Sequence, residues 1–127
     1  MTESDRVAPP LAPVRGASLD AWLSYLEWLH PSTIDMGLDR VRAVARALEL
    51  DPGCVVVTVA GTNGKGSTCA MLEAILRAEG YRVGLYTSPH LSRFSERARI
   101  DGQELDDEAF VRQFEAVEAS RGNVSLT

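Results

Sequence analysis

An uninterrupted apolar run that ends in a glycine-rich turn is the feature that most restricts how this chain can fold. The run is CVVVTVA (Cys54–Ala60), and the turn GTNGKGS (Gly61–Ser67) follows it directly. Because the run is β-branched and lacks polar alternation, it predicts a strand covered on both faces, as in a parallel sheet flanked by helices. An apolar-periodic helix over Ser67–Ala78 and a second apolar segment, RVGLYTS (Arg82–Ser88), come next. This order predicts a right-handed βαβ unit in an α/β protein.

The turn between the predicted strand and helix has the composition of a phosphate-binding loop. Its glycines allow successive backbone N–H groups to converge on an anion, and the helix N-terminus adds free donors and a favourable dipole. Lys65 is then placed to reach the β- and γ-phosphates of a nucleotide as a point charge. A plain tight turn between strand and helix is the alternative interpretation.

The loop departs from the general pattern G-x-x-x-x-G-K-[ST] at two positions. Val59 stands in place of the first glycine, and Gly66 stands in place of the hydroxyl residue that normally ligates Mg²⁺. The hydroxyl must therefore come from Ser67 or from another segment. Ser88 is a candidate because it ends the next predicted strand, and parallel strands bring their carboxyl ends to the same edge of a sheet.

Charge and composition exclude several classes of protein. The formal charge of −5 gives no general attraction to nucleic acid or to anionic membranes. No apolar run is long enough to span a bilayer, and the N-terminus lacks the pattern of a secretory signal. Cys54 and Cys69 have neither metal-ligand spacing nor a disulfide framework, so they are interpreted as reduced structural thiols. We therefore expect a cytoplasmic protein with no nucleic-acid or membrane partner.

The rest of the chain reads as a leader followed by helices and one hairpin. Residues 1–17 are expected to be a disordered leader, and residues 18–127 the N-terminal part of one α/β domain. Helical periodicity predicts helices after Ser18, over Leu38–Leu48, and after Asp106 or Asp107. The Asp101–Gly102 pair predicts a hairpin turn. The aromatic residues of the first helix are interpreted as packing residues rather than stacking platforms; they are Trp22, Tyr25 and Trp28.

Several motifs, taken in order, resemble a known family. VAGTNGKGS (Val59–Ser67), YTSPHL (Tyr86–Leu91) and FSERARIDG (Phe94–Gly102) are similar to the folate branch of the Mur-ligase superfamily, the dihydrofolate and folylpolyglutamate synthases. The block Ser18–Val41 is similar to the N-terminal helices and substrate loop of that family. The resemblance covers roughly Ser18–Thr127. It implies a partial Mur-ligase-like ATP-binding domain with a P-loop, incomplete at the C-terminus.

The resemblance also implies a reaction. In this family an ATP-dependent ligase activates a carboxylate as an acyl phosphate, which the amino group of L-glutamate then attacks. The acceptors are dihydropteroate, which gives dihydrofolate, and reduced folates that carry polyglutamate. Mg²⁺ is the implied cofactor, and the full-length enzyme is expected to be a monomer. Because the later strands, further metal ligands and second domain of the family are missing here, the chain is expected to be an N-terminal fragment, inactive alone and marginally folded.

Site residues follow from the same resemblance. It implies that ATP is bound by Gly61, Thr62, Asn63, Gly64, Lys65, Gly66 and Ser67, with Lys65 as the catalytic cation, and that Mg²⁺ is bound by Ser88. It places the pterin-bearing substrate against Ile34, Asp35, Met36 and Thr127. His90 is a further candidate for phosphate or for the water shell of the metal, although it is equally suited to cap a turn. Arg97 is a candidate for an anionic substrate, although ERAR (Glu96–Arg99) is also typical of a solvated strand face.

Three other functions remain open from the sequence. A small P-loop phosphotransferase would consume ATP without depending on glutamate. A stand-alone nucleotide-binding module would bind ATP without chemistry. A peptidoglycan ligase of the Mur type would use muramyl substrates, although the segment STIDMGL (Ser32–Leu38) favours the folate branch.

Overall fold

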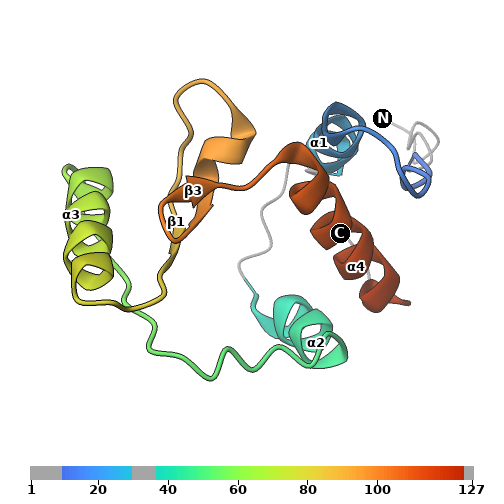
Figure 1. Cartoon of the computed structure of the whole chain (residues 1–127). Coiled ribbons are helices and arrows are strands. Elements are labelled where there is room, and N and C mark those ends of the chain that lie inside the picture. Colours follow the sequence, from blue (N-terminus) through green and yellow to red (C-terminus); the bar gives the residue numbers. More distant parts are fainter. Residues whose placement is uncertain (1–9, 30–36, 125–127) are drawn as a thin grey trace. The chain divides into compact units, whose positions relative to one another are not determined.

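The computed structural model describes residues 10–29 and 37–124 (Figure 1). Its contacts divide the chain into two compact units. Residues 1–51 together with residues 111–127 form one, which we call the helical unit, and residues 52–110 form the other, the loop–sheet unit. The domain boundary expected at residue 17 stays a prediction. None of the helices in the described ranges is long and apolar enough to cross a membrane.

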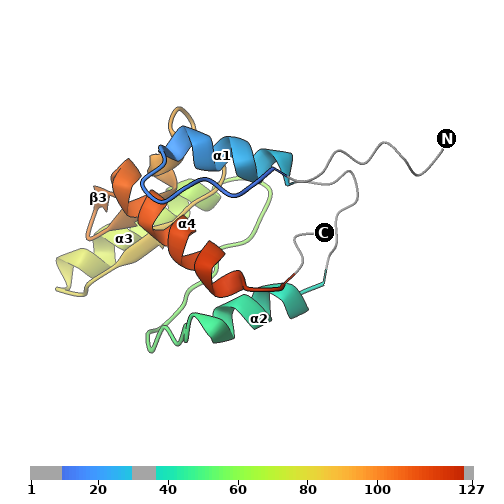
Figure 2. The same ribbon diagram turned by 90° about the vertical axis from the view of Figure 1, so that its right-hand side faces the viewer.

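The helical unit is built on packing between α1 (Leu19–Trp28) and the C-terminal part of α4 (Asp107–Arg121). Ser18 caps α1, because its Oγ accepts a hydrogen bond from the N–H of Ala21 at 3.3 Å. Trp22 is only 2% exposed, and its ring lies 6.0 Å from that of Phe114 in α4. Figures 1 and 2 show the two helices side by side. The packing role predicted for Trp22 and Tyr25 is confirmed, whereas Trp28 is exposed.

The second helix of this unit, α2 (Asp39–Ala47), lies within one residue of its predicted bounds. Its apolar side chains do not form a buried face, since no residue of α2 is buried and Leu38 and Val41 are exposed. The apolar periodicity therefore predicted the bounds of the helix correctly, but the described residues do not bury its apolar face.

The loop–sheet unit contains α3 (Lys65–Ala78) and a three-stranded sheet. The strands are β1 (Gly84–Tyr86), β2 (Ala98–Ile100) and β3 (Gln103–Glu104), and the 3₁₀ helix η1 (Phe94–Arg97) leads into β2. β2 pairs antiparallel with both neighbours. The predicted hairpin turn at Asp101–Gly102 is confirmed, with φ of +50° and +80°, as a primed turn requires.

The predicted parallel sheet is not formed within residues 10–29 and 37–124. Cys54–Ala60 belongs to no helix or strand, and β1 pairs antiparallel with β2 instead of parallel with that run (Figure 1). Val55, Val56 and Val57 are 91%, 70% and 63% exposed, and Cys54 is exposed as well. The physical reason is that a parallel strand needs a hydrogen-bonding neighbour and covered faces, and no described element supplies them here. The predicted buried strand and βαβ unit are thus wrong for the described part of the chain.

A buried ion pair joins α3 to the sheet. The inward face of α3 carries Cys69, Leu72, Glu73 and Leu76, at the i, i+3, i+4, i+7 spacing of one helix face. The Glu73 side chain is 7% exposed, and its Oε2 lies 2.6 Å from Nη2 of Arg99 in β2. The other carboxylate oxygen, Oε1, is buried without a hydrogen-bond partner. Arg99 is thus not part of a solvated strand face, as ERAR had suggested, but neutralises a buried carboxylate.

Candidate functional site

The glycine-rich loop enters α3 through a left-handed residue. Gly64 precedes the helix with φ of +77° and ψ of +1°, a conformation that residues with a Cβ rarely adopt. Lys65 is the first residue of α3, two residues earlier than the sequence predicted. The local reason is that the glycine reverses the chain and allows the helix to start immediately after it.

The ammonium group of Lys65 lies over the loop from which it comes. Nζ donates to the backbone oxygen of Gly61 at 2.5 Å and to that of Thr62 at 3.3 Å. No side chain caps the N-terminus of α3, so the N–H groups of its first turn are not used by a capping side chain. A cation and a helix N-terminus therefore occupy the same loop, an arrangement that suits the binding of a phosphate group.

Three of the predicted site residues lie together after β1. The N–H of Thr87 donates to the backbone oxygen of Arg97 at 2.8 Å, which places Ser88 and His90 beside the end of η1. The Nε of Arg97 donates to Nδ1 of His90 at 2.9 Å. The guanidinium carbon of Arg97 lies 4.8 Å from the centre of the Phe94 ring, and the His90 ring meets the same ring edge-on at 5.9 Å. Ser88 and His90 are exposed.

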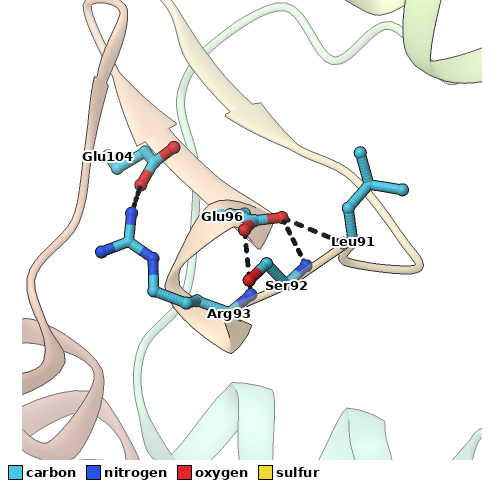
Figure 3. Close-up of polar contacts among 5 residues, drawn as sticks. All are labelled: Leu91, Ser92, Arg93, Glu96 and Glu104. Atoms are coloured by element: carbon cyan, nitrogen blue, oxygen red, sulfur yellow. Dashed lines mark hydrogen bonds and ion pairs between the residues drawn. The ribbon is translucent and has the colours of Figure 1, made fainter.

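A carboxylate fixes the backbone of this segment. Glu96 accepts hydrogen bonds from the N–H groups of Leu91 at 2.9 Å, Ser92 at 3.2 Å and Arg93 at 2.9 Å (Figure 3). These backbone hydrogen bonds, that of Arg93 foremost, hold the pKa of Glu96 below its ordinary value. The side chain of Arg93 forms an ion pair with Glu104 at 3.0 Å, as Figure 3 also shows.

The structure therefore gives two groups of candidate residues in the loop–sheet unit. One is the loop Gly61–Ser67, and the other is the segment Ser88–Arg97. Among the described residues, no hydrogen bond or ion pair of Lys65 or Ser88 joins the two groups. The predicted substrate residues Ile34, Asp35, Met36 and Thr127 lie outside the described residues.

Sequence reasoning missed the structural role of Glu96. A carboxylate three residues after Arg93 matches the spacing of a helix-capping residue, and this was the signal that could have identified it. It also missed Phe94, on which both His90 and Arg97 pack. No local pattern predicts that contact.

The residues present are compatible with Mg²⁺ that is held mainly by a nucleotide. Within the described ranges there is no group of three or more His, Cys, Asp or Glu side chains placed to hold a metal ion. Mg²⁺ commonly takes one or two protein ligands and completes its shell with phosphate oxygens and water. The exposed hydroxyls of Ser67 and Ser88 are the available protein ligands of this kind, and the choice between them stays a prediction.

Comparison with known proteins connects these features to one family. No family model matches the chain. The dihydrofolate synthase/folylpolyglutamate synthase of Escherichia coli (strain K12) is 55% identical over 116 residues, which make up 91% of this chain and 28% of that protein. The chain is related to the dihydrofolate synthase/folylpolyglutamate synthases. It spans 28% and 24% of the length of the first two curated relatives it matches, which is about a quarter.

Solved structures of dihydrofolate synthase/folylpolyglutamate synthases have a similar backbone over the matching part. E. coli FolC in complex with DHPP and ADP gives a TM-score of 0.83 at 55% identity, covering 91% of this chain and 28% of that one. The Yersinia pestis bifunctional folylpolyglutamate synthase/dihydrofolate synthase, complexed with AMPPNP and Mn ion, gives 0.85 at 53% identity, covering 92% and 29%. The predicted partial α/β domain of this ligase fold is thereby confirmed, although the described strands do not pair in parallel.

Proposed function

We propose that this chain supplies the loop that binds the phosphates of ATP in a ligase that adds L-glutamate to dihydropteroate and to reduced folylpolyglutamates. The observation that carries the proposal is the loop Gly61–Ser67, where the ammonium of Lys65 and the N-terminus of α3 meet. The similarity to dihydrofolate synthase/folylpolyglutamate synthases supplies the reaction and the substrates.

The loop would act mainly by placing positive charge next to the phosphates of ATP. Its backbone N–H groups bind the phosphates, and Lys65 neutralises charge as the substrate carboxylate attacks the γ-phosphorus and ADP leaves. The product of this step is an acyl phosphate. The amino group of glutamate then attacks the acyl carbon, and inorganic phosphate leaves as the amide forms. Both steps depend on alignment and charge neutralisation, which backbone donors and one lysine can supply.

Other predicted residues belong to the same proposal. Mg²⁺ would be held by Ser88, with Ser67 as the alternative, and would neutralise negative charge on the phosphates. Ile34, Asp35, Met36 and Thr127 would bind the pterin-bearing substrate. A monomeric enzyme in the cytoplasm, without nucleic-acid or membrane partners, completes the proposal.

A chimeric enzyme tests the proposal without requiring this chain to act alone. The matching 116 residues of the E. coli enzyme are replaced by those of this chain, and dihydrofolate formation is measured with ATP, glutamate and dihydropteroate. We expect turnover that depends on all three substrates. A folded chimera that binds ATP without turnover would instead indicate a nucleotide-binding module, and ATP hydrolysis without glutamate dependence would indicate a phosphotransferase. Turnover with muramyl substrates would indicate a peptidoglycan ligase.

Variants of the chimera test the loop itself. Lys65→Ala is expected to lower kcat by about two to three orders of magnitude, as loss of a transition-state donor does. Arg82→Ala is the matched control, because Arg82 is an exposed cation outside the loop that forms an ion pair with Asp101 at 3.5 Å. Equal losses in the two variants would contradict a specific role for Lys65.

A further inference from the structure

We propose that the ion pair between Glu73 and Arg99 sets where the loop Gly61–Ser67 lies relative to the segment Ser88–Arg97. Neither Glu73 nor Arg99 is assigned a contact with ATP or with another substrate, so both are positioning residues. The effect on catalysis rests on the proposed function, whereas the positioning itself is tested without ATP or substrate.

The two groups of candidate residues belong to different secondary-structure elements. The loop Gly61–Ser67 runs into α3, which begins at Lys65. The segment Ser88–Arg97 follows β1 and runs directly into β2. Among the described residues, no hydrogen bond or ion pair of Lys65 or Ser88 joins the two groups. The separation of the two groups therefore depends on how α3 packs against the sheet.

The covalent connection between α3 and the sheet does not fix the loop by itself. Residues 79–83 join the C-terminus of α3 to β1, whereas the loop lies at the opposite end of the helix. α3 has 14 residues and is about 20 Å long, so a tilt of about 10° about its C-terminal end would move Lys65 by about 3 Å. A displacement of about 1 Å between reacting groups is enough to lower a rate by about a hundredfold. A contact along the helix is therefore needed to hold the loop in one position.

The ion pair is such a contact, and it is directional. Oε2 of Glu73 lies 2.6 Å from Nη2 of Arg99, and the Glu73 side chain is 7% exposed. Because Oε1 of Glu73 has no hydrogen-bond partner among the described residues, Arg99 is the polar group that orients this carboxylate. A charge-assisted hydrogen bond weakens steeply when its geometry changes, whereas apolar packing is non-directional. The pair thus restricts the position of α3 against β2 more narrowly than apolar burial does.

A second contact lies one helical turn further along α3. A Cβ added to Gly102 would lie 2.1 Å from Nη1 of Arg77, so the guanidinium of Arg77 lies directly against the turn between β2 and β3. Arg77 follows Glu73 by four residues, which places both on neighbouring positions of one helix face. α3 therefore meets the hairpin at two points along its length, and two points oppose a tilt that one point would permit.

The β-sheet carries the position of Arg99 to Ser88. Arg99 is paired in register with Leu85 of β1. The N–H of Thr87 donates to the backbone oxygen of Arg97 at 2.8 Å, and Ser88 follows Thr87 directly. The contact that holds Arg99 against α3 therefore also sets the distance between Ser88 and the loop at the start of α3.

Steady-state kinetics of the chimera provide the first test. In Glu73→Leu/Arg99→Met the directional contact is replaced by apolar side chains, which often replace a buried ion pair without loss of stability. We expect kcat to fall about ten- to a hundredfold. The KM for ATP should stay within about threefold, because the loop itself is unchanged. A double variant that is folded and retains the kcat of the parent would overturn the proposal.

A conservative variant and a matched control separate positioning from general damage. Glu73→Gln keeps an acceptor oxygen for Arg99, so its kcat should stay within about threefold of the parent. Asp39→Leu/Arg42→Met removes an exposed ion pair of α2 at 3.5 Å and should leave kcat unchanged. Each variant is assayed where urea unfolding shows it to be folded. A loss of kcat in Glu73→Gln or in the α2 variant as large as that in Glu73→Leu/Arg99→Met would contradict a specific positioning role.

A distance measurement on the 127-residue chain is independent of the reaction. Nitroxide labels are attached to Thr62→Cys and Ser92→Cys in a chain without its two native cysteines, Cys54 and Cys69, and pulsed electron paramagnetic resonance gives the distribution of label distances. We expect one narrow population in the parent. In Glu73→Leu/Arg99→Met the distribution should broaden by about 3 Å, the displacement that a tilt of α3 by about 10° produces.

The outcomes distinguish this proposal from the proposed function. If the parent chimera is inactive but the distribution broadens in the double variant, the assigned reaction fails and the positioning role stands. If the distributions of the parent and the double variant are equally wide, the positioning role fails whatever the chimera does. A broad distribution in the parent chain would also contradict it.

Discussion

Removal of Arg99 should destabilise the loop–sheet unit far more than removal of its partner. In Arg99→Met the methionine keeps most of the apolar stem, and Glu73 remains as a buried carboxylate on the inward face of α3. Its Oε1 already lacks a partner, so loss of the 2.6 Å contact at Oε2 leaves the whole carboxylate without a compensating group. Glu73→Leu removes the buried charge instead and leaves an arginine that water can reach.

The exposed fractions set the size of the effect. Breaking a buried ion pair by deleting one partner destabilises by about 3–5 kcal/mol, and we take about 3 because Arg99 is 31% exposed. Glu73→Leu should lower the free energy of unfolding by about 1 kcal/mol, since the orphaned guanidinium is partly hydrated. The double variant Glu73→Leu/Arg99→Met should lie within about 1 kcal/mol of the parent, because apolar residues of similar volume often replace a buried pair without loss.

Urea unfolding followed by far-UV circular dichroism measures all four proteins of this cycle. The slope m should be constant, so that shifts in midpoint report stability. The expected order is parent and double variant highest, then Glu73→Leu, then Arg99→Met. If Arg99→Met does not fold at all, recovery of folding in the double variant still supports the reasoning. The reasoning is refuted if Arg99→Met is no less stable than Glu73→Leu.

Three further predictions concern other parts of the chain. The pKa of Glu96 lies below its ordinary value in the folded state, so its contribution to stability is complete above the pKa of the unfolded chain and is lost as pH falls through the folded pKa. Glu96→Gln should therefore reduce the loss of stability on the acid side of a stability–pH curve. An unchanged acid side would contradict this. Gly64→Ala should lower the free energy of unfolding by about 1–2 kcal/mol because of the positive φ of Gly64. Gly66 has a helical backbone and open space where a Cβ would lie, so Gly66→Ala should raise the free energy of unfolding by up to about 1 kcal/mol in urea unfolding. Changes of the same sign in both variants would be contrary to this account. Trp22→Ala should destabilise the helical unit by about 3–5 kcal/mol in thermal unfolding, and a loss below about 1 kcal/mol would show that Trp22 is not central to that core.

Local signals in the sequence were sufficient for the helices and the hairpin. Ser18 and Asp106 are capping residues at the starts of α1 and α4, and each bonds a backbone N–H three residues later. The Asp101–Gly102 turn specifies its own geometry. Such features depend on neighbours within four residues, which is why composition and spacing predict them.

Pairing between distant segments was not predictable in the same way. The valine run Cys54–Ala60 has the composition of a buried strand, but whether a strand forms depends on a neighbour elsewhere in the chain. Glu73 lies on an otherwise apolar helix face, and only its partner Arg99, 26 residues later, makes that position tolerable. The periodicity of α3 could have marked Glu73 as an inward charge, without naming the residue that neutralises it.

The candidate site shows the same difference between local features and contacts of separated residues. The glycines, the lysine and the following helix predict a phosphate-binding loop because the loop is contiguous in sequence, and phosphate binding there stays a prediction. The arrangement of His90, Phe94 and Arg97 depends on η1 and on the hydrogen bonds that Glu96 accepts from three backbone N–H groups. The sequence identified His90 and Arg97 as separate candidates, and the structure adds the hydrogen bond that joins them.

Binding of ATP to the 127-residue chain, measured by isothermal titration calorimetry, tests the central claim most directly. The account predicts saturable binding with Mg²⁺ that pyrophosphate competes away. It also predicts that Lys65→Ala weakens binding about tenfold or more while Arg82→Ala leaves it unchanged. Two results would contradict the claim that Gly61–Ser67 binds the phosphates of ATP. One is the absence of binding in a chain shown to be folded, and the other is equal binding in the Lys65 and Arg82 variants.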